Sequence, residues 1–237
     1  RNESMKKIGV IFGGMSTEHE VSISSGTSII SNLDKQKYEI LPIYISKSGE
    51  WYKYTKPVQD IVPLHVGDEI TELEKIENEF ECLKSLDIAF PVLHGLYGED
   101  GTIQGLLELL KIKYVGCKVL SSSICMDKVY AKIVFDKAEI PQADYAYVKA
   151  EEGKYTYVHK NFDEETLNLD QICEKIENKL GLPVFVKPSN SGSSVGINKA
   201  ENVEELKHAI EYASKYDTKI LIEEEIVGRE IECAVLG

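Results

Sequence analysis

The first half of the chain alternates short apolar runs with longer segments of mixed polarity. Apolar runs occupy residues 6–14, 38–45 and 87–95. Runs of this length are typical of strands that are buried on both faces of a parallel sheet. The segments 16–33, behind a Ser/Thr cap, and 103–110 carry apolar residues at helical spacing, as expected for helices that cover such a sheet. The pattern predicts an open α/β domain over about the first 125 residues.

Other segments give further predictions. The acidic segment 68–83 predicts an amphipathic helix with a solvated charged face, because its apolar residues lie three or four apart: Ile70, Leu73, Ile76, Phe80 and Leu83. A helix is predicted after Met126 as far as Ala138, with the chain extended again at Pro141. The polar segment 149–170 has no clear period, which leaves a strand pair and a long mobile loop as alternatives.

The last third predicts strands around one helix. Strands are predicted at 184–187 and 196–199, and a helix at 203–215 with Asn202 and Glu205 as its capping pair. Two further strands are predicted on either side of a turn at Val227 and Gly228.

Composition narrows the class of protein. The 237 residues carry a net charge of −13, which argues against a nucleic-acid partner because phosphate backbones are bound by excess Lys and Arg. No apolar run is long enough to span a bilayer and no secretory leader precedes Met5, so the sequence predicts a cytoplasmic protein without a membrane partner. Residues 1–4 resemble a remnant of cloning. The five cysteines form no C-x-x-C pair and are predicted to be small buried hydrophobes.

The stretch "VFVKPSNSGSSVGI" (184–197) is the most informative motif. An apolar strand that ends at Lys187, followed by a Ser/Gly loop, is suited to a polyphosphate, because backbone N–H groups and one point charge can surround it. The spacing fits neither the P-loop nor the dinucleotide-binding fingerprint. Taken alone, the stretch fits a surface hairpin with a solvated lysine equally well.

Further motifs extend this interpretation. "SSICMDKVYAK" places Lys128 at a helix start, and "LIEEEIVGRE" places four glutamates around a turn after a buried strand. With "FGGMSTEHEVS" and "HGLYGEDGTIQGLLE" they closely resemble the D-alanine–D-alanine ligase family, in the same order from Lys6 to Gly237. The resemblance implies an N-terminal open parallel-sheet domain (1–126), a central ATP-grasp domain (127–229), and the start of a C-terminal ATP-grasp domain (230–237) truncated at its end.

The resemblance also implies an ATP site. Lys128 and Lys187 are similar to the family's two phosphate-binding lysines. Glu223, with the backbone of Glu224 and Ile226, resembles the adenine-binding hinge, and Glu230 resembles the carboxylate that binds the ribose hydroxyls. The loop residues implied to cover the phosphates are Ser189, Gly192, Ser193, Ser194 and Val195.

An amino-acid site is implied in the same way. Glu18 is similar to the family carboxylate that binds the ammonium of the first D-alanine, Ser193 to a serine in its hydrogen-bonding network, and His94 to a histidine near the reacting carboxyl group. We expect Glu99 and Asp100 to fix a turn and cap the next helix, and His19 to be a surface or turn residue.

The implied reaction phosphorylates D-alanine with ATP, after which a second D-amino acid attacks the acyl phosphate and the dipeptide serves peptidoglycan synthesis. Mg²⁺ (or Mn²⁺) is the implied metal, with no ligands in this chain and ligands expected beyond Gly237. The family is usually homodimeric. Three alternatives stay open: a D-Ala-D-Ser or D-Ala-D-lactate ligase of the vancomycin-resistance type, another ATP-grasp carboxylate–amine ligase, and a non-catalytic ATP-binding module.

Overall fold

The computed structural model describes residues 5–192 and 194–235. The chain divides into two compact units, residues 1–127 with 190–193, and residues 128–189 with 194–237. Each unit has its own sheet and core. In the described part of the chain no helix has both the length and the apolar character needed to cross a bilayer.

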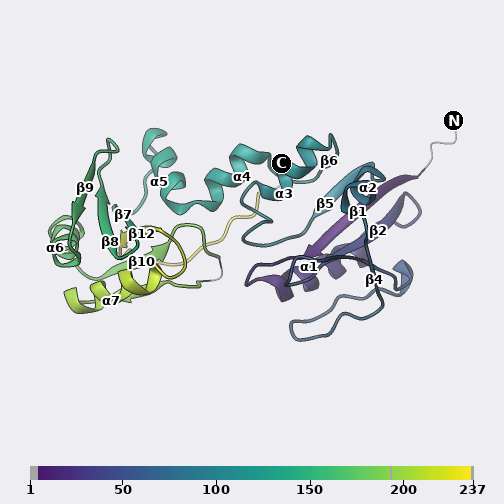
Figure 1. Cartoon of the computed structure of the whole chain (residues 1–237), viewed down its shortest axis with the longest axis horizontal. Coiled ribbons are helices and arrows are strands. Elements are labelled where there is room, and N and C mark those ends of the chain that lie inside the picture. Colours follow the sequence, from purple (N-terminus) through teal and green to yellow (C-terminus); the bar gives the residue numbers. More distant parts are fainter. Residues whose placement is uncertain (1–4, 193, 236–237) are drawn as a thin grey trace. The chain divides into compact units, whose positions relative to one another are not determined.

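The first unit is built on a six-stranded sheet of order β4-β3-β2-β1-β5-β6 (Figure 1). Strands β2, β1, β5 and β6 are parallel, while β3 and β4 extend the β2 edge in antiparallel fashion. Its elements are β1 (Lys6–Gly13), α1 (His19–Asn32), β2 (Tyr38–Ile45), β3 (Trp51–Tyr54), the 3₁₀ turn η1 (Val58–Asp60), β4 (Leu73–Lys75), α2 (Glu79–Lys84), β5 (Ile88–Pro91), α3 (Thr102–Leu109), β6 (Lys113–Tyr114) and α4 (Val119–Met126).

Alternation along β1 divides the core of this unit into two layers. Val10 and Phe12 pack with Ile23 and Ile30 of α1, whereas Ile11 faces the layer that contains Leu107 of α3. Because successive side chains of a strand point to opposite faces, one apolar run fills both layers. The predicted α/β domain is therefore confirmed, with a mixed sheet in place of a purely parallel one.

The second unit has a six-stranded antiparallel sheet of order β11-β10-β12-β7-β8-β9. Its elements are α5 (Lys128–Lys137), β7 (Tyr145–Glu151), β8 (Lys154–Val158), β9 (Glu164–Leu167), α6 (Leu169–Leu180), β10 (Val184–Pro188), β11 (Asn198–Ala200), α7 (Val203–Ala213) and β12 (Lys219–Glu224).

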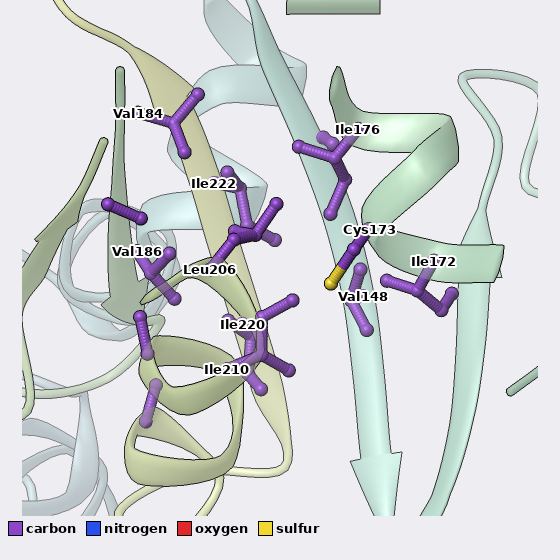
Figure 2. Close-up of a cluster of buried hydrophobic side chains, with 14 of the residues drawn as sticks. Val148, Ile172, Cys173, Ile176, Val184, Val186, Leu206, Ile210, Ile220 and Ile222 are labelled. Atoms are coloured by element: carbon purple, nitrogen blue, oxygen red, sulfur yellow. The ribbon is translucent and has the colours of Figure 1, made fainter. Parts of the chain in front are cut away.

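Helices α6 and α7 cover one face of this sheet. Figure 2 shows Ile172, Cys173 and Ile176 of α6 and Leu206 and Ile210 of α7 turned toward the strands. The strand side chains that face these helices are Val184, Val186, Val148, Ile220 and Ile222. They alternate along the strands with side chains that point to the opposite face. Both helices begin at an asparagine whose side chain accepts an N–H of the first turn, Asn168 from Gln171 and Asn202 from Glu205.

The helix predicted over 68–83 is wrong. Leu73 lies in the short strand β4 opposite Tyr54, and the Asn78 side chain caps a separate short helix by accepting the N–H of Glu81. The spacing of three or four residues arises because a strand and a helix, each with its own buried positions, follow one another. Phe80 is an exposed side chain and not part of a continuous apolar face.

Other predictions have mixed outcomes. The segment 149–170 contains a strand pair, β8 and β9, and no long loop. The strand predicted after Gly228 is wrong for the described residues, since none is found between Glu225 and Val235. The Ser/Thr cap of α1 is also wrong, because the residue before the helix is Glu18 and its side chain makes no capping bond. Of the cysteines only Cys173 is buried.

Candidate active site

Two side chains predicted to bind a nucleotide, those of Lys187 and Glu223, lie on the face of the second sheet opposite α6 and α7. Along β10, Val184 and Val186 are buried in the layer under these helices, while Phe185 and Lys187 point the other way. The strand predicted at 184–187 is therefore confirmed, with Lys187 inside it. The Lys187 side chain uses the opposite face of the strand.

Glu223 faces Lys187 across the neighbouring strand. In the register of β10 and β12, Phe185 pairs with Glu223 and Lys187 pairs with Leu221, so Lys187 and Glu223 are diagonal neighbours on one face. The Lys187 Nζ lies 2.6 Å from Glu223 Oε2. Sequence reasoning identified both residues, and the structure brings them together.

A second lysine, which sequence reasoning missed, holds the other oxygen of Glu223. Lys132 Nζ, from helix α5, lies 2.5 Å from Glu223 Oε1, and the side chains of both residues are 12% exposed. Lys132 is four residues after Lys128 in "MDKVYAK", a spacing that places both on one side of a helix. That spacing was the signal in the sequence from which Lys132 could have been predicted to lie near the nucleotide site.

Two opposing effects set the charge state of Glu223. Burial raises the pKa of its carboxyl group, but the two lysine ammonium groups more than offset burial and hold the pKa below its ordinary value of 4.5. Glu223 is therefore ionised at neutral pH and can accept hydrogen bonds. Its carboxylate is paired with two ammonium groups, those of Lys132 and Lys187.

Lys128 and Ser189 join the start of α5 to the end of β10. The backbone N–H of Lys128 donates to the Ser189 carbonyl at 3.0 Å, and the N–H of Val129 donates to the Ser189 hydroxyl at 3.1 Å. Lys128 Nζ lies 3.5 Å from the same carbonyl. The Ser189 side chain is fully buried and already accepts a backbone N–H in this arrangement.

The other residues of the predicted phosphate loop lie between β10 and β11. Ser194 is exposed with φ at +60°, and Val195 is half-buried. Gly192 belongs to the first unit, where a Cβ in its place would overlap the Glu18 carboxylate. Ser193 lies outside the described residues.

The other residues predicted to bind adenine and ribose lie at the end of β12 and beyond it. Glu224 Oε1 accepts the backbone N–H of Asp144 at 2.8 Å, so its side chain holds the start of β7. Ile226 and Glu230 are exposed, beyond the end of the strand. The structure does not bring Glu230 against Lys187 or Glu223, and these assignments stay predictions.

The predicted amino-acid site lies in the first unit, where β1 and β5 end. The Ser16 hydroxyl donates to the His94 carbonyl at 2.7 Å and accepts the N–H of Glu18 at 3.1 Å. Gly95 has φ at +69°, and a Cβ added there would lie 2.5 Å from Glu18 Oε2. Glu18 and His94 thus lie together where a side chain at Gly95 would displace the Glu18 carboxylate.

The imidazole of His94 lies between two polar side chains. Its Nε2 is 3.1 Å from the Ser25 hydroxyl, a residue that sequence reasoning missed, and its Nδ1 is 3.7 Å from Glu99 Oε1. An apolar cavity of about 180 Å³ lies beside it, lined among others by Leu93, Tyr97 and Ile103. Open α/β sheets place ligands beyond the carboxyl ends of their strands, which is where this group is found.

The His94–Glu99 pair shifts the pKa of both members. The Glu99 carboxylate raises the pKa of His94 above its ordinary 6.5 and outweighs burial, which lowers it. His94 in turn holds the pKa of Glu99 below 4.5 against the opposing effect of burial, and the N–H of Gly95, 2.9 Å from Glu99 Oε2, lowers it further.

We expect this pair to stabilise the fold within a defined pH window. Glu99 stabilises above its unfolded pKa, and this contribution is lost as pH falls through its depressed folded pKa. His94 stabilises below its unfolded pKa, and this contribution is lost as pH rises through its raised folded pKa. The contribution is therefore complete between about pH 4.5 and 6.5. Urea unfolding of the chain and of Glu99→Gln from pH 4 to 9 should give a difference that is largest in that window, and a difference independent of pH would contradict the pairing.

His19 is not the surface or turn residue that was predicted. It is the first residue of α1, 4% exposed, and its ring nitrogens face the Gly14 carbonyl and, at 3.2 Å, the Tyr44 hydroxyl. These bonds fix the turn after β1 that precedes Glu18. Asp100 acts largely as predicted, since its carboxylate accepts the N–H groups of Tyr97 and Thr102.

Known protein families match both units. The family described as "D-ala D-ala ligase N-terminus" matches residues 7–117, and that described as "D-ala D-ala ligase C-terminus" matches residues 134–237. The chain belongs to the D-alanine–D-alanine ligase family. The resemblance seen in the sequence is confirmed.

Individual relatives agree with this assignment. The chain is 51% identical to a D-alanine–D-alanine ligase of Clostridium acetobutylicum and 49% identical to one of Caldicellulosiruptor bescii, each over 98% of this chain. It spans 64% and 63% of the length of these ligases.

Solved structures of D-alanine ligases share the fold. The VanG D-Ala:D-Ser ligase of Enterococcus faecalis superposes with a TM-score of 0.76 at 37% identity, over 95% of this chain and 64% of that one. The D-alanine–D-alanine ligase of Bacillus anthracis gives 0.67 at 36% identity, over 95% and 59%. The ATP-grasp architecture predicted for the second unit is the architecture of these ligases.

Proposed function

We propose that the chain carries the amino-acid and nucleotide sites of an ATP-dependent ligase that joins D-alanine to a second D-alanine. The observation that carries the proposal is the Lys187–Glu223 pair on the face of the second sheet opposite α6 and α7, in a chain whose two units both match ligase families. The dipeptide product would supply peptidoglycan synthesis.

The second unit would bind ATP through complementary charge and hydrogen bonding. Lys187 and Lys128 bind the α- and β-phosphates, and the Glu223 carboxylate accepts a hydrogen bond from the exocyclic amine of adenine. The backbone of Glu224 and Ile226 binds the ring edge, and Glu230 binds the ribose hydroxyls. In phosphoryl transfer a protein mainly positions groups and stabilises charge, and lysines beside an ionised acceptor supply both.

The loop 189–195 would close over the phosphates. Its Ser and Gly residues offer backbone N–H groups with little steric hindrance, and the left-handed backbone at Ser194 is typical of turns that direct successive N–H groups to one side. Closure of such a loop excludes water from the reacting phosphate.

The first unit would bind the first D-alanine. The Glu18 carboxylate binds its ammonium group. His94, whose pKa is raised by its contact with Glu99, lies near its carboxylate and reduces the negative charge there in its protonated form. Ser193 would complete the hydrogen-bonding network. ATP phosphorylates the carboxylate, and the resulting acyl phosphate has the leaving group that a carboxylate lacks.

Mg²⁺ is the metal that this family generally needs. Among residues 5–192 and 194–235, however, no group of three His, Cys, Asp or Glu side chains is arranged to hold a metal ion. The described residues therefore do not fit a magnesium site, and we assign no step of the reaction to one here.

The second substrate is proposed as D-alanine and not D-serine or D-lactate. The relatives with 51%, 49% and 47% identity over nearly the whole chain are all named D-alanine–D-alanine ligases. The identity to the D-Ala:D-Ser ligase structure, 37%, is lower and close to the 36% for the Bacillus anthracis D-alanine–D-alanine ligase.

Product analysis tests the proposed function. The whole gene product is incubated with Mg-ATP and equal D-alanine, D-serine and D-lactate, and products are identified by mass spectrometry while phosphate release is followed. We expect D-Ala-D-Ala and phosphate that is released only when D-alanine is present. D-Ala-D-Ser or D-Ala-D-lactate as main product would contradict the proposed substrate, and ATP binding without release dependent on D-alanine would contradict the ligase.

A further inference from the structure

Glu223 has two cationic partners that differ in how they are held. Lys132 contacts Oε1 and Lys187 contacts Oε2, so each carboxylate oxygen has its own ammonium group. The Lys132 side chain is 12% exposed and that of Lys187 is 28% exposed. All three residues lie in the second unit.

Lys132 is anchored from several sides. Its Nζ also donates to the Ala143 carbonyl at 3.1 Å and lies 5.6 Å from the centre of the Tyr145 ring. Its backbone carbonyl accepts the side-chain amide of Gln142 at 2.8 Å. Lys132 is therefore held in place by contacts that join α5 to the strands β7 and β12 and to the segment before β7.

Lys187 lies on the more exposed side of the carboxylate. Its Nζ is 5.9 Å from the centre of the ring of Phe185, which precedes it by two residues on the same face of β10. A phosphate that drew Lys187 away would remove one of the two cations from Glu223. The remaining one would be Lys132.

We propose that Lys132 is a positioning residue that keeps Glu223 ionised and correctly oriented for the adenine amine once Lys187 has turned to the phosphates. The proposal rests on the proposed function, and names a specificity determinant for it. A largely buried carboxylate that lost both cations would take up a proton, because an unpaired charge is costly away from water. Lys132 prevents this.

The consequence is selectivity between purine bases. Adenine presents an amino group, a hydrogen-bond donor, at the position where guanine presents a carbonyl, an acceptor. An ionised Glu223 accepts from the first and repels the second, whereas a protonated Glu223 can donate to the second. Lys132 would therefore set the preference for ATP over GTP, although it touches neither base.

Glu223 is faced by titratable groups from three elements. They are the ammonium groups of Lys132 from α5 and Lys187 from β10, and the Tyr145 phenol from β7, the residue that pairs with Glu223 in the sheet. The Tyr145 hydroxyl donates to Asp136 at 2.9 Å and stays protonated at neutral pH, because burial raises its pKa. Changes in the charge of Glu223 near neutral pH thus depend on the two lysines.

The test is the ratio of Kd values for GTP and ATP, measured by calorimetry on the 237-residue chain and on Lys132→Met. We expect the variant to bind ATP about tenfold more weakly, with GTP binding unchanged or improved. Between about pH 7 and pH 5 the preference should fall in Lys132→Met and stay constant in the unchanged chain. Lys132→Arg should restore most of the preference.

Lys160→Met is the matched control. Lys160 also lies over the Tyr145 ring, at 5.8 Å, and pairs with Asp136, but no contact of its side chain with Glu223 is found in the described structure. Its removal should leave the ratio unchanged. If Lys132→Met does not fold, Glu223→Gln tests the same charge with Lys132 in place and should also lower the preference for ATP.

The outcomes separate this inference from the proposed function. A chain that binds no ATP would contradict the proposed function itself. A chain that prefers ATP, together with a Lys132→Met variant that weakens ATP and GTP equally or changes neither, would overturn the role of Lys132 and leave the proposed function intact. An unchanged preference in Glu223→Gln would overturn it as well.

Discussion

Lys187→Met should weaken ATP binding by about ten- to a hundredfold while the second unit stays folded. A hydrogen bond to a charged group contributes about 1.5–3 kcal/mol, and each 1.4 kcal/mol is a factor of ten in Kd. Loss of the ammonium group removes such a bond to phosphate. Glu223 keeps Lys132 as a partner at 2.5 Å, so no unpaired carboxylate is left to destabilise the sheet.

Lys207→Met is the control for this prediction. The Lys207 side chain is as exposed as that of Lys187, 28%, and also pairs with a carboxylate, that of Asp170, but it lies on α7, which covers the other face of the sheet. Calorimetric titration should show weaker ATP binding in Lys187→Met than in Lys207→Met. Circular dichroism spectra and melting temperatures of the two variants should be the same. Equal ATP affinity in the unchanged chain and in Lys187→Met would remove Lys187 from the nucleotide site.

Glu18→Gln should spare ATP binding and raise the D-alanine concentration needed for half-maximal phosphate release by about ten- to a hundredfold, because the ammonium group loses an ionic partner. The measurement uses the whole gene product. Glu20→Gln is the control, since Glu20 lies in the first turn of the same helix and pairs with Lys47 at 3.1 Å. Unaltered D-alanine dependence in Glu18→Gln would place the ammonium site elsewhere.

Gly95→Ala should produce the same defect without any change of charge. The added Cβ would lie 2.5 Å from Glu18 Oε2, so the carboxylate must move. Gly67→Ala is a matched control, because Gly67 also has a positive φ, +95°, but nothing lies within 4 Å of an added Cβ. Both variants should lose about 1–2 kcal/mol of unfolding free energy from the left-handed backbone. Only Gly95→Ala should change the D-alanine dependence, and equal behaviour of the two would contradict the contact.

Sequence patterns predicted the elements whose signal is local. The helix after Met126, the strand that carries Lys187 and the Asn202 cap all follow from neighbouring residues, and the structure contains them. The spacing that failed, in the segment 68–83, failed because it crosses a boundary that Asn78 creates. Leu73 of β4 packs in the layer under α1, whereas Leu83 of α2 packs in the layer on the other side of the sheet. A three-to-four spacing does not distinguish one helix from such a strand followed by a helix.

The sequence predicted individual residues of the candidate site but not which of them contact one another. Lys187 and Glu223 were recognised from motifs that are 36 residues apart, and only strand register makes them neighbours. Lys132 gave a weaker signal, because a second lysine one helical turn after Lys128 is common on solvated helices. Its importance depends on the packing of α5 against β12, which brings its ammonium group to a buried carboxylate.

The most direct test of the proposed nucleotide site is a crystal structure of the chain with a non-hydrolysable ATP analogue. We expect the nucleotide on the sheet face opposite α6 and α7, with the adenine amine at the Glu223 carboxylate, the phosphates at Lys187 and Lys128, and Lys132 still paired with Glu223. A nucleotide bound elsewhere on the second unit, with the Lys187–Glu223 pair intact, would contradict it.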